Sequence, residues 1–203
     1  MAVITISRQF GSGAEDLGKK LAKKLGYTFV DKAIVQMISK QANVSPNFVK
    51  LVESQGGSKL SKFISTLVSK SKVDSILSSE RGYIDEEIYI DYLILIIAQI
   101  ADEGNAIIMG RGSQYILKDH PDTFHILLIN DFKNRVKYVM EMGKVSEKKA
   151  TRVVMNEDKR RENLYGKLGK KDYNDASLYH LVLNLGRFSI DSALKQVLTM
   201  VNQ

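Results

Sequence analysis

Residues 3–25 constrain the fold more than any other stretch of this chain. An apolar, β-branched run at residues 3–6 leads into the turn Gly11-Ser12-Gly13, and a helical pattern follows. Small and apolar residues recur there at spacings of three and four, which places them on one helix face: Ala14, Leu17, Gly18, Leu21 and Leu25. The stretch therefore predicts a strand, a glycine loop and a helix. Unpaired N–H groups of the loop and first helical turn would converge at the positive end of the helix dipole, which favours a bound phosphate.

The loop differs from the known phosphate loop, Gly-x-x-x-x-Gly-Lys-Ser/Thr. With Gly13 as the last glycine, Arg8 replaces the first glycine, Ala14 the lysine and Glu15 the hydroxyl that binds magnesium. A literal match from Gly13 onward would put its second glycine and its lysine inside the helix, and we reject it. Two interpretations stay open: the loop binds a phosphate, or its glycines only turn the chain.

Four more apolar stretches are typical of strands, and helical patterns follow each of them. The strands are expected at residues 28–30, 106–109, 123–130 and 181–184, and the helices at 33–42, 85–103, 113–117, 131–143, 146–165 and from 189 onward. Asp131 and Ser146 are the expected N-caps of two of these helices. Strands that alternate with helices predict an α/β fold of three layers, with a five-stranded parallel sheet and helices on both faces.

Two polar clusters follow strands of this sheet. Asp31 and Lys32 come directly after the second strand, and Gly110-Arg111-Gly112 follows the third. In an open α/β sheet the ligand binds outside the carboxyl ends of the strands. We therefore expect both clusters near the ligand.

The positive charge of the chain is concentrated in one segment. There are 30 Lys and Arg against 23 Asp and Glu, a net charge of +7, and residues 133–172 alone hold 13 basic and six acidic side chains. Beside a phosphate loop such a segment suggests the clamping of a polyanionic small molecule or contact with nucleic acid; a solvated helix face is the plain alternative. We expect one domain over residues 1–203, with a helical insertion at 43–85 and a basic segment at 144–172.

Composition excludes several other classes of protein. Without cysteine, the chain has neither disulfides nor thiolate zinc, and its scattered histidines, His120, His125 and His180, suggest no metal site. The longest apolar run, residues 92–98, is too short to cross a bilayer. The first residues lead directly into a strand without a secretory leader. We expect a soluble protein in the cytoplasm, with no membrane partner.

Five motifs then occur in order over nearly the whole chain. They are Ile6-Ser7-Arg8 with Gly11-Ser12-Gly13, Tyr27 to Asp31-Lys32, Gly110-Arg111-Gly112, Asp158-Lys159-Arg160-Arg161 with Tyr165, and Tyr179-His180-Leu181-Val182-Leu183-Asn184. The ordered set resembles the cytidylate kinase-like family within the P-loop nucleoside monophosphate kinases. This resemblance implies the three-layer P-loop NTPase fold of those kinases.

The resemblance also implies how two nucleotides bind. The donor, ATP, would be held through its phosphates by the loop and through its base by the last strand end; the residues are Gly11, Ser12, Gly13, Ala14, Glu15, Asn184 and Arg187. The acceptor nucleotide would be bound by Arg111, with Asp31 and Lys32 beside it, under the insertion at 43–85.

In such kinases a basic lid, here residues 144–172, brings cations to the phosphoryl group in transit. The Asp-x-x-Arg spacing assigns this role to Arg161, with Arg160 and Lys159 near it. Phosphoryl transfer is accelerated chiefly by positioning and by such cations. Asp31 or Asp158 would be the carboxylate near the metal or the acceptor, unless each is only a cap or an ion-pair partner.

Three positions depart from the typical family pattern. Ala14 and Glu15 replace the loop lysine and its neighbouring hydroxyl, and Gly112 stands where an aspartate is usual. Arg8 could take the place of the lysine, because arginine binds phosphate in a forked geometry. Glu15 could bind Mg²⁺ or could repel the nucleotide.

Three functions follow from these observations. The first is transfer of the terminal phosphoryl group of ATP, with Mg²⁺, to a nucleoside monophosphate such as CMP or dCMP or to a similar small acceptor. The second is a catalytically weak protein that binds a nucleotide or phosphate for regulation. The third is binding of nucleic acid through the basic segment, with Tyr138, Tyr165 and Tyr173 stacking on bases. The sequence leaves the acceptor and the oligomeric state open.

Overall fold

A computed structural model describes residues 2–43, 45–54 and 86–202 of the chain. Five strands form one sheet in the order β2-β3-β1-β4-β5, and every neighbouring pair is parallel. The strands are β1 (Val3–Arg8), β2 (Thr28–Val30), β3 (Ala106–Met109), β4 (Thr123–Ile129) and β5 (Leu181–Asn184). The sequence predicts the five strands and their parallel arrangement, and the structure adds their order. Because β1 lies between β3 and β4, its carboxyl end opens at the centre of the sheet, where ligands of such folds bind.

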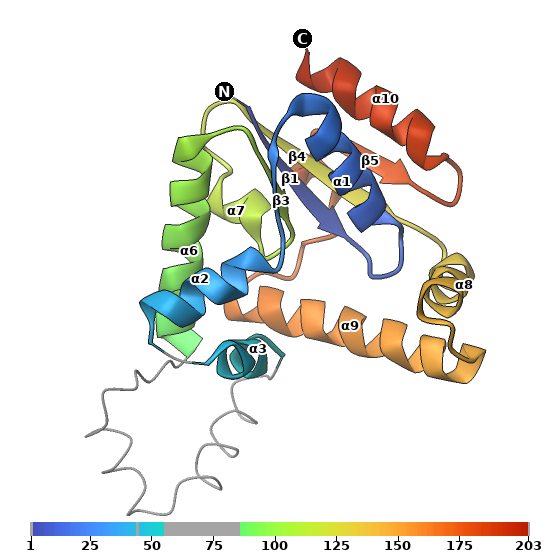
Figure 1. Cartoon of the computed structure of the whole chain (residues 1–203), viewed down its shortest axis with the longest axis horizontal. Helices are drawn as coiled ribbons and strands as arrows, with labels where there is room; N and C mark the ends of the chain where they lie inside the picture. Colours follow the sequence, from blue (N-terminus) through green and yellow to red (C-terminus); the bar gives the residue numbers. More distant parts are fainter. Residues whose placement is uncertain (1, 44, 55–85, 203) are drawn as a thin grey trace, which may run out of the picture.

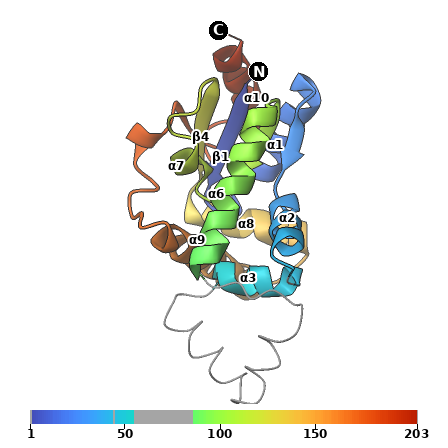
Figure 2. The same cartoon turned by 90° about the vertical axis from the view of Figure 1, so that its left-hand side faces the viewer.

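Helices cover both faces of the sheet, which confirms the predicted three layers (Figure 1). On one face, α1 (Ala14–Leu25) and α10 (Ile190–Val201) pack on residues such as Ile4 and Ile6 of β1. On the other face lie α2 (Ala33–Gln41), α6 (Glu86–Glu103) and α7 (Ser113–Ile116). Figure 2 shows α6 in front of β1. Side chains of a strand alternate between the two faces, so neighbours in β1 enter different cores.

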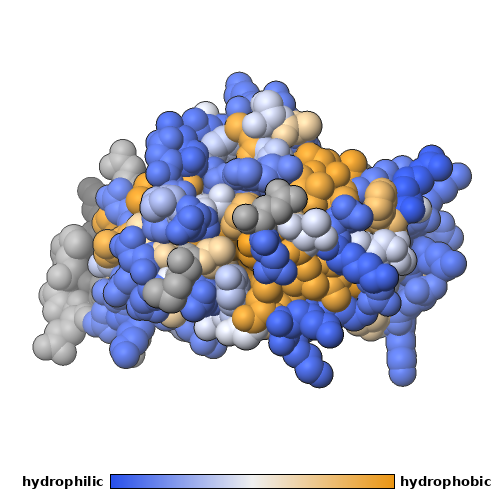
Figure 3. All heavy atoms as spheres, turned by 90° about the horizontal axis from the view of Figure 1, so that it is seen from above, coloured by the Kyte–Doolittle hydropathy of each residue, from blue (hydrophilic) through white to orange (hydrophobic). Residues whose placement is uncertain are grey.

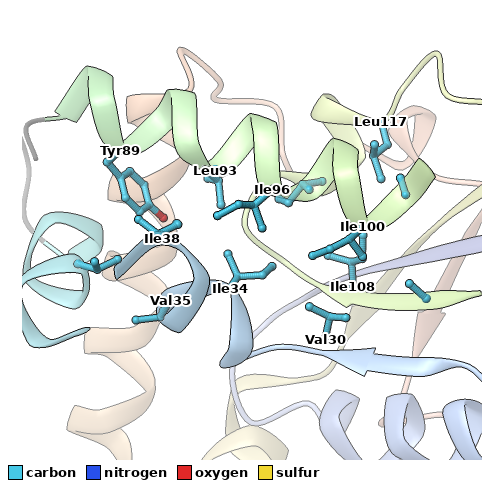
Figure 4. Packing of buried hydrophobic residues seen from close by; sticks show 14 of the residues in the cluster. Val30, Ile34, Val35, Ile38, Tyr89, Leu93, Ile96, Ile100, Ile108 and Leu117 are labelled. Carbon is cyan, nitrogen blue, oxygen red and sulfur yellow. The ribbon is translucent and has the colours of Figure 1, made fainter. Parts of the chain in front are cut away.

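The core on the face of the sheet that α2, α6 and α7 cover lies mainly between α6 and α2. Figure 4 shows Tyr89, Leu93 and Ile96 of α6 pointing toward Ile34 and Ile38 of α2, and all five are buried. One more helix, α3 (Pro46–Ser54), contacts α2, α6 and α9. The rest of the insertion predicted at 43–85 lies outside the described residues.

Two more helices pack against each other and cross at a wide angle (Figure 1). They are α8 (Phe132–Gly143) and α9 (Glu147–Lys167), which pack together through Val136, Ala150 and Val154. In Figure 1, α9 runs across the end of the sheet toward which β1 points. A short 3-10 helix, η1 (Ala176–Leu178), leads from there to β5. The basic segment therefore lies beside the carboxyl ends of the strands.

The predicted caps of α8 and α9 are only half right. Asp131 and Ser146 occupy the N-cap positions with extended backbones, but in the described part of the chain neither side chain makes a capping hydrogen bond. Their carbonyl oxygens accept the first helical bonds instead, from Arg135 and Ala150. The patterns locate the helix starts correctly and misassign what stabilises them.

The surface seen from above Figure 1 is largely hydrophilic, and its largest hydrophobic area lies near the centre of the view (Figure 3). Within the described residues, no helix is long and apolar enough to span a membrane.

Candidate active site

The glycine loop after β1 has the geometry of an anion site. Gly11 and Gly13 adopt left-handed backbones, with φ of 78° and 87°. A Cβ at Gly11 would lie 2.8 Å from the carbonyl oxygen of Arg135, so the loop packs directly on α8. No side chain among the described residues caps the N-terminus of α1, which begins at Ala14. The Ser12 hydroxyl is buried and has no partner in that same part of the chain. Uncapped N–H groups and an orphaned hydroxyl are typical of a site that a phosphate fills.

Contacts with Asn130, after β4, and with Arg135 of α8 hold this loop in place. The side chain of Gln9 accepts a hydrogen bond from the backbone of Asn130 at 3.0 Å. Arg135, which is buried, donates to the carbonyl oxygen of Phe10 at 3.2 Å and to both carboxylate oxygens of Asp158 at 2.9 Å. Asp158 thus ties the lid helix to the loop through Arg135, which is the ion-pair role that the sequence left open for it.

Charged side chains of alternating sign connect β1 with α9, and we call them the arginine–carboxylate chain. In order, they are Arg8, Asp31, Arg111, Glu53 and Arg160. The Asp31 carboxylate lies 3.6 Å from Arg8 and 3.4 Å from Arg111. The Glu53 carboxylate lies 3.0 Å from Arg111 and 2.7 Å from Arg160. Four predicted site residues are therefore brought together, and Glu53 joins them as a fifth.

Arg8 is poorly paired for a charged side chain. Within the described residues its guanidinium makes the 3.6 Å ion pair with Asp31 and no hydrogen bond. Burial lowers the pKa of Arg8; Asp31 opposes this shift, and the like charges of Arg111 and Arg161 add to it. Arginine still stays protonated. A guanidinium with unused donors at the centre of the sheet is therefore a ready binding site for an anion.

Two glycines make room for these arginines. A Cβ at Gly110 would lie 2.6 Å from Nη1 of Arg8. A Cβ at Gly112 would collide with the tip of the Leu168 side chain, so Leu168 lies directly against this glycine. Arg111 lies between them with φ of 56°, a left-handed conformation that a side chain rarely adopts. Such local strain is typical of functional sites.

Arg161 reaches the end of β1 from the lid. Its Nη2 donates to the Ser7 hydroxyl at 3.2 Å, and its guanidinium lies over the rings of Tyr165 and Tyr173 at 5.3 and 4.8 Å. The two rings stack 4.5 Å apart, and the Tyr165 hydroxyl lies 3.0 Å from that of Ser7. Gln114 also donates to Tyr165, at 3.0 Å. These contacts fix Arg161 beside the glycine loop.

Other predicted site residues lie apart from this group. Lys159 is exposed and pairs with Glu162 at 2.8 Å. The Glu15 carboxylate accepts a hydrogen bond from Lys19 at 2.7 Å, which lowers its pKa, so it stays ionised at the first turn of α1. Lys32, the N-cap of α2, is exposed.

The residues expected near the donor base lie after β5. The side chain of Asn184 accepts from the backbone of Gly186 at 2.9 Å, and Arg187 is exposed. A Cβ at Gly186 would lie 2.5 Å from the side-chain oxygen of Asn130 and 3.0 Å from the amide nitrogen of Asn134. Amide side chains thus gather at the ends of β4 and β5, on the side of the loop that the donor base was expected to occupy.

The tyrosines proposed to stack on nucleic-acid bases are already engaged. Tyr165 is 1% exposed, and its ring stacks on Tyr173. Tyr138 donates to Asp16 at 2.8 Å. A base would have to displace these contacts, so the site offers no ready stacking platform.

Sequence reasoning missed Glu53, Tyr89 and Arg135. A signal for Glu53 exists: it follows Val49 by four residues and so shares the buried face of α3. An acidic residue on an apolar helix face is unusual enough to mark it. Arg135 and Tyr89 carry no such signal, because each lies in a helix of mixed or apolar composition.

A parallel sheet with a glycine loop after its central strand, and arginines gathered around that loop, is the architecture of the P-loop kinases. A profile of the cytidylate kinase-like family matches residues 3–187, and the chain belongs to this family. The match confirms the resemblance drawn from the five motifs.

Solved structures agree with this fold. An uncharacterised protein from Eubacterium ventriosum ATCC 27560 matches with a TM-score of 0.69 at 20% identity, covering 100% of this chain and 99% of that one. Shikimate kinase from Bacteroides thetaiotaomicron matches with a TM-score of 0.51 at 13% identity, covering 100% and 99%. A gluconokinase from Sinorhizobium meliloti 1021 matches with a TM-score of 0.51 at 10% identity, covering 99% and 91%. No curated protein matches the chain. Family and fold together support a nucleotide or small-molecule kinase.

Proposed function

We propose that the protein transfers the terminal phosphoryl group of ATP to a nucleoside monophosphate, CMP or dCMP being the first candidates. The observation that carries this proposal is Arg8, whose guanidinium lies beside the glycine loop with an ion pair at 3.6 Å and no hydrogen bond within the described residues. The Arg8 side chain is only 29% exposed, and a partly buried cation with unused donors is costly unless a ligand completes it. The phosphates of ATP are the ligand that the neighbouring loop fits.

The donor would bind through the loop and the ends of β4 and β5. The backbone of Gly11, Ser12, Gly13 and Ala14 would surround the phosphates, and the buried Ser12 hydroxyl would gain the partner it lacks among the described residues. Asn184 and Arg187 would lie toward the base.

The acceptor would bind on the opposite side of β1, toward β2. Arg111 is the central residue there, with Asp31 and Lys32 at its edge. Half of its guanidinium is held by Asp31 and Glu53, so its orientation is fixed before a ligand arrives. A preorganised guanidinium binds a phosphate with little loss of side-chain entropy.

Arginines would surround the phosphoryl group between donor and acceptor. Arg8 and Arg161 flank the end of β1, and Arg160 lies one residue before Arg161 on α9. Lys159 is the weakest of the predicted catalytic residues, because it points to solvent and would reach the site only if the lid, residues 144–172, moved. Fixed cations where charge develops are the main source of catalysis in phosphoryl transfer.

Magnesium would arrive with the nucleotide. Among the described residues no cluster of three or more His, Asp or Glu side chains forms a cation cage. Mg²⁺ keeps much of its water and is usually bound by substrate phosphates plus one or two protein groups. The ionised Glu15 carboxylate and the orphaned Ser12 hydroxyl fit that role at the start of α1. When bound, the ion neutralises charge on the phosphates of ATP.

One observation favours a second candidate, a catalytically weak nucleotide-binding regulatory protein. Ala14 supplies no charge where the loop lysine usually stands, and Glu15 next to it is ionised. If Arg8 does not replace the lysine, nucleotide would bind without efficient transfer.

A coupled assay of nucleoside diphosphate formation separates the two candidates. The protein is incubated with ATP, Mg²⁺ and each of CMP, dCMP, UMP and AMP, in parallel with Arg8→Ala and with Lys137→Ala, an exposed control on α8. Turnover with a pyrimidine monophosphate that Arg8→Ala abolishes and Lys137→Ala leaves intact supports the kinase. Nucleotide binding without turnover on any acceptor supports the regulatory protein.

A further inference from the structure

The buried carboxylate of Glu53 joins four elements of the site. Glu53 is 2% exposed and lies on α3. It accepts hydrogen bonds from Tyr89 of α6 at 3.0 Å, from Arg111 after β3 at 3.0 Å and from Arg160 of α9 at 2.7 Å. Burial and the Glu53 charge raise the pKa of Tyr89 well above its ordinary value, so its hydroxyl stays a donor. With three donors the carboxylate is satisfied and has no need of an external cation.

The effect of Glu53 is therefore on the two arginines. Arg111 donates from Nε to Glu53 and from Nη1 to the carbonyl oxygen of Asp31, at 3.0 and 2.8 Å. Two fixed donors set the plane of a rigid guanidinium. Its Nη2 has no partner among the residues that the structure describes, and this edge is the one left for a ligand.

Arg160 depends on Glu53 more strongly. Its Nη2 lies 2.7 Å from the buried Glu53 carboxylate, whereas its Nη1 lies 3.5 Å from Glu157, which is about a third exposed. The arginine side chain itself is 35% exposed. Without Glu53 the remaining partner is a weak surface ion pair, which would not hold a long side chain in place.

Glu53 also lets like charges gather. Arg111 lowers the pKa of Arg8, which shows that the arginines repel one another across the site. Asp31 and Glu53 alternate with three arginines along the arginine–carboxylate chain, so each positive group has a negative neighbour. Three guanidinium groups against two carboxylates still leave an excess of positive charge for an anionic ligand.

We propose that Glu53 is a positioning residue for the acceptor: it holds Arg111 and Arg160 in the orientation that binds the anionic group of the acceptor, and so sets acceptor affinity. The proposal rests on the proposed function for its choice of acceptor. Within the described residues, the hydrogen bonds of Glu53 go to Tyr89, Arg111 and Arg160 and none goes to the glycine loop, so we expect donor binding to change little without it.

The test compares Glu53→Gln with Glu157→Gln, which makes the same chemical change at the partly exposed carboxylate beside the same arginine. In Glu53→Gln one carboxylate oxygen becomes an amide NH₂ group, which cannot accept a hydrogen bond, so either Arg160 or Arg111 loses its acceptor. Calorimetry without ATP measures binding of CMP and of cytidine, which lacks the phosphate. We expect Glu53→Gln to weaken CMP binding at least about tenfold and to leave cytidine binding unchanged, because a charge-assisted hydrogen bond to the phosphate is lost. Glu157→Gln should bind CMP as the wild type does.

Steady-state kinetics adds a second readout. Glu53→Gln should raise the KM for CMP by a similar factor and leave the KM for ATP within about twofold, a split that a general loss of structure would not produce. Equal CMP affinity in the two variants, or equal weakening of CMP and cytidine, would overturn the proposal. If Glu53→Gln does not fold, Tyr89→Phe provides the test. This variant removes the hydrogen bond from Tyr89 to Glu53, so the carboxylate is held less firmly and CMP binding should weaken about two- to fivefold. Unchanged CMP binding would refute the proposal.

The outcomes for the proposed function and for Glu53 are separable. If the wild-type protein binds CMP but shows no turnover, the proposed function is wrong, and the calorimetric comparison of the two variants still tests the role of Glu53. Wild-type turnover with unchanged CMP binding in Glu53→Gln removes the role of Glu53 alone. Absence of both CMP binding and turnover in the wild type overturns both.

Discussion

Replacing Arg8 by methionine should stabilise the ligand-free protein and inactivate it. Methionine keeps an unbranched side chain of similar length but removes the charge. At 3.6 Å the attraction to Asp31 is about 4–5 kcal/mol for an effective dielectric constant of about 20. Burial and the repulsion of Arg111 and Arg161 outweigh it, because the net pKa of Arg8 is lowered. The charge of Arg8 therefore destabilises the folded protein.

We expect Arg8→Met to raise the free energy of unfolding by about 1 kcal/mol, which corresponds to about 2–4 °C in Tm for a chain of this length. The value of kcat/KM should fall by about 10³-fold or more, as for other arginines that act on a transferring phosphoryl group. Thermal unfolding followed by circular dichroism, together with the coupled assay, measures both effects.

Two results would contradict this role of Arg8. A Tm lowered by several degrees would show that Arg8 stabilises the fold, for example by fixing Asp31. Activity within tenfold of wild type would show that the guanidinium does not act on the phosphates. Lys137→Ala, a change of charge at an exposed site, should move neither quantity.

Three further predictions concern other parts of the molecule. Gly110→Ala should lower activity at least about tenfold and cost about 1–3 kcal/mol of stability, because the new Cβ meets Arg8. Gly26→Ala is the control: Gly26 has nearly the same φ as Gly110, 70°, but open space around it, so this variant shows the effect of backbone strain alone and should keep its activity. Burial and the neighbouring His180 lower the pKa of His125 to about 4, so as the pH falls the unfolded chain takes up this proton before the folded protein does, and stability is lost between about pH 6.5 and 4. Urea unfolding should show a loss of about 1–2 kcal/mol over this range. The variant His125→Asn should lose less stability, whereas an equal loss in the variant would assign the effect to other groups. Tyr165→Phe removes the hydroxyl that meets Ser7 and should lower kcat about tenfold with little change in the KM for CMP; an unchanged kcat in steady-state assays would mean that stacking alone positions Arg161.

Local patterns predicted the parts of the fold that depend on neighbours in sequence. The strand, loop and helix of residues 3–25 follow from an apolar β-branched run, from glycine and from helical spacing, and each of these acts within a few residues. The order of the strands is different, because it depends on how the chain crosses over. The sequence therefore showed five parallel strands without showing that β1 lies at their centre.

The candidate site divides in the same way. Arg8, Asp31 and Arg111 follow strands, and parallel strands bring their carboxyl ends to one edge, so their proximity could be expected. Glu53 meets Arg111 across 58 residues and Arg160 across 107. No local pattern encodes such a pair. Lys159 shows the converse: the helix pattern places it near Arg160 in sequence, but one step along α9 turns a side chain by about 100°, and it points to solvent.

Transfer of a phosphoryl group from ATP to a nucleoside monophosphate is the activity that we propose for this chain. The most direct measurement follows the γ-phosphoryl group itself: ATP labelled at that position is incubated with Mg²⁺, CMP and the protein, and the labelled products are separated by chromatography. We predict label in CDP with the wild type and with Lys137→Ala, and none with Arg8→Met. Label that stays in ATP, or appears only in inorganic phosphate, with CMP and with the other monophosphates, would contradict the account.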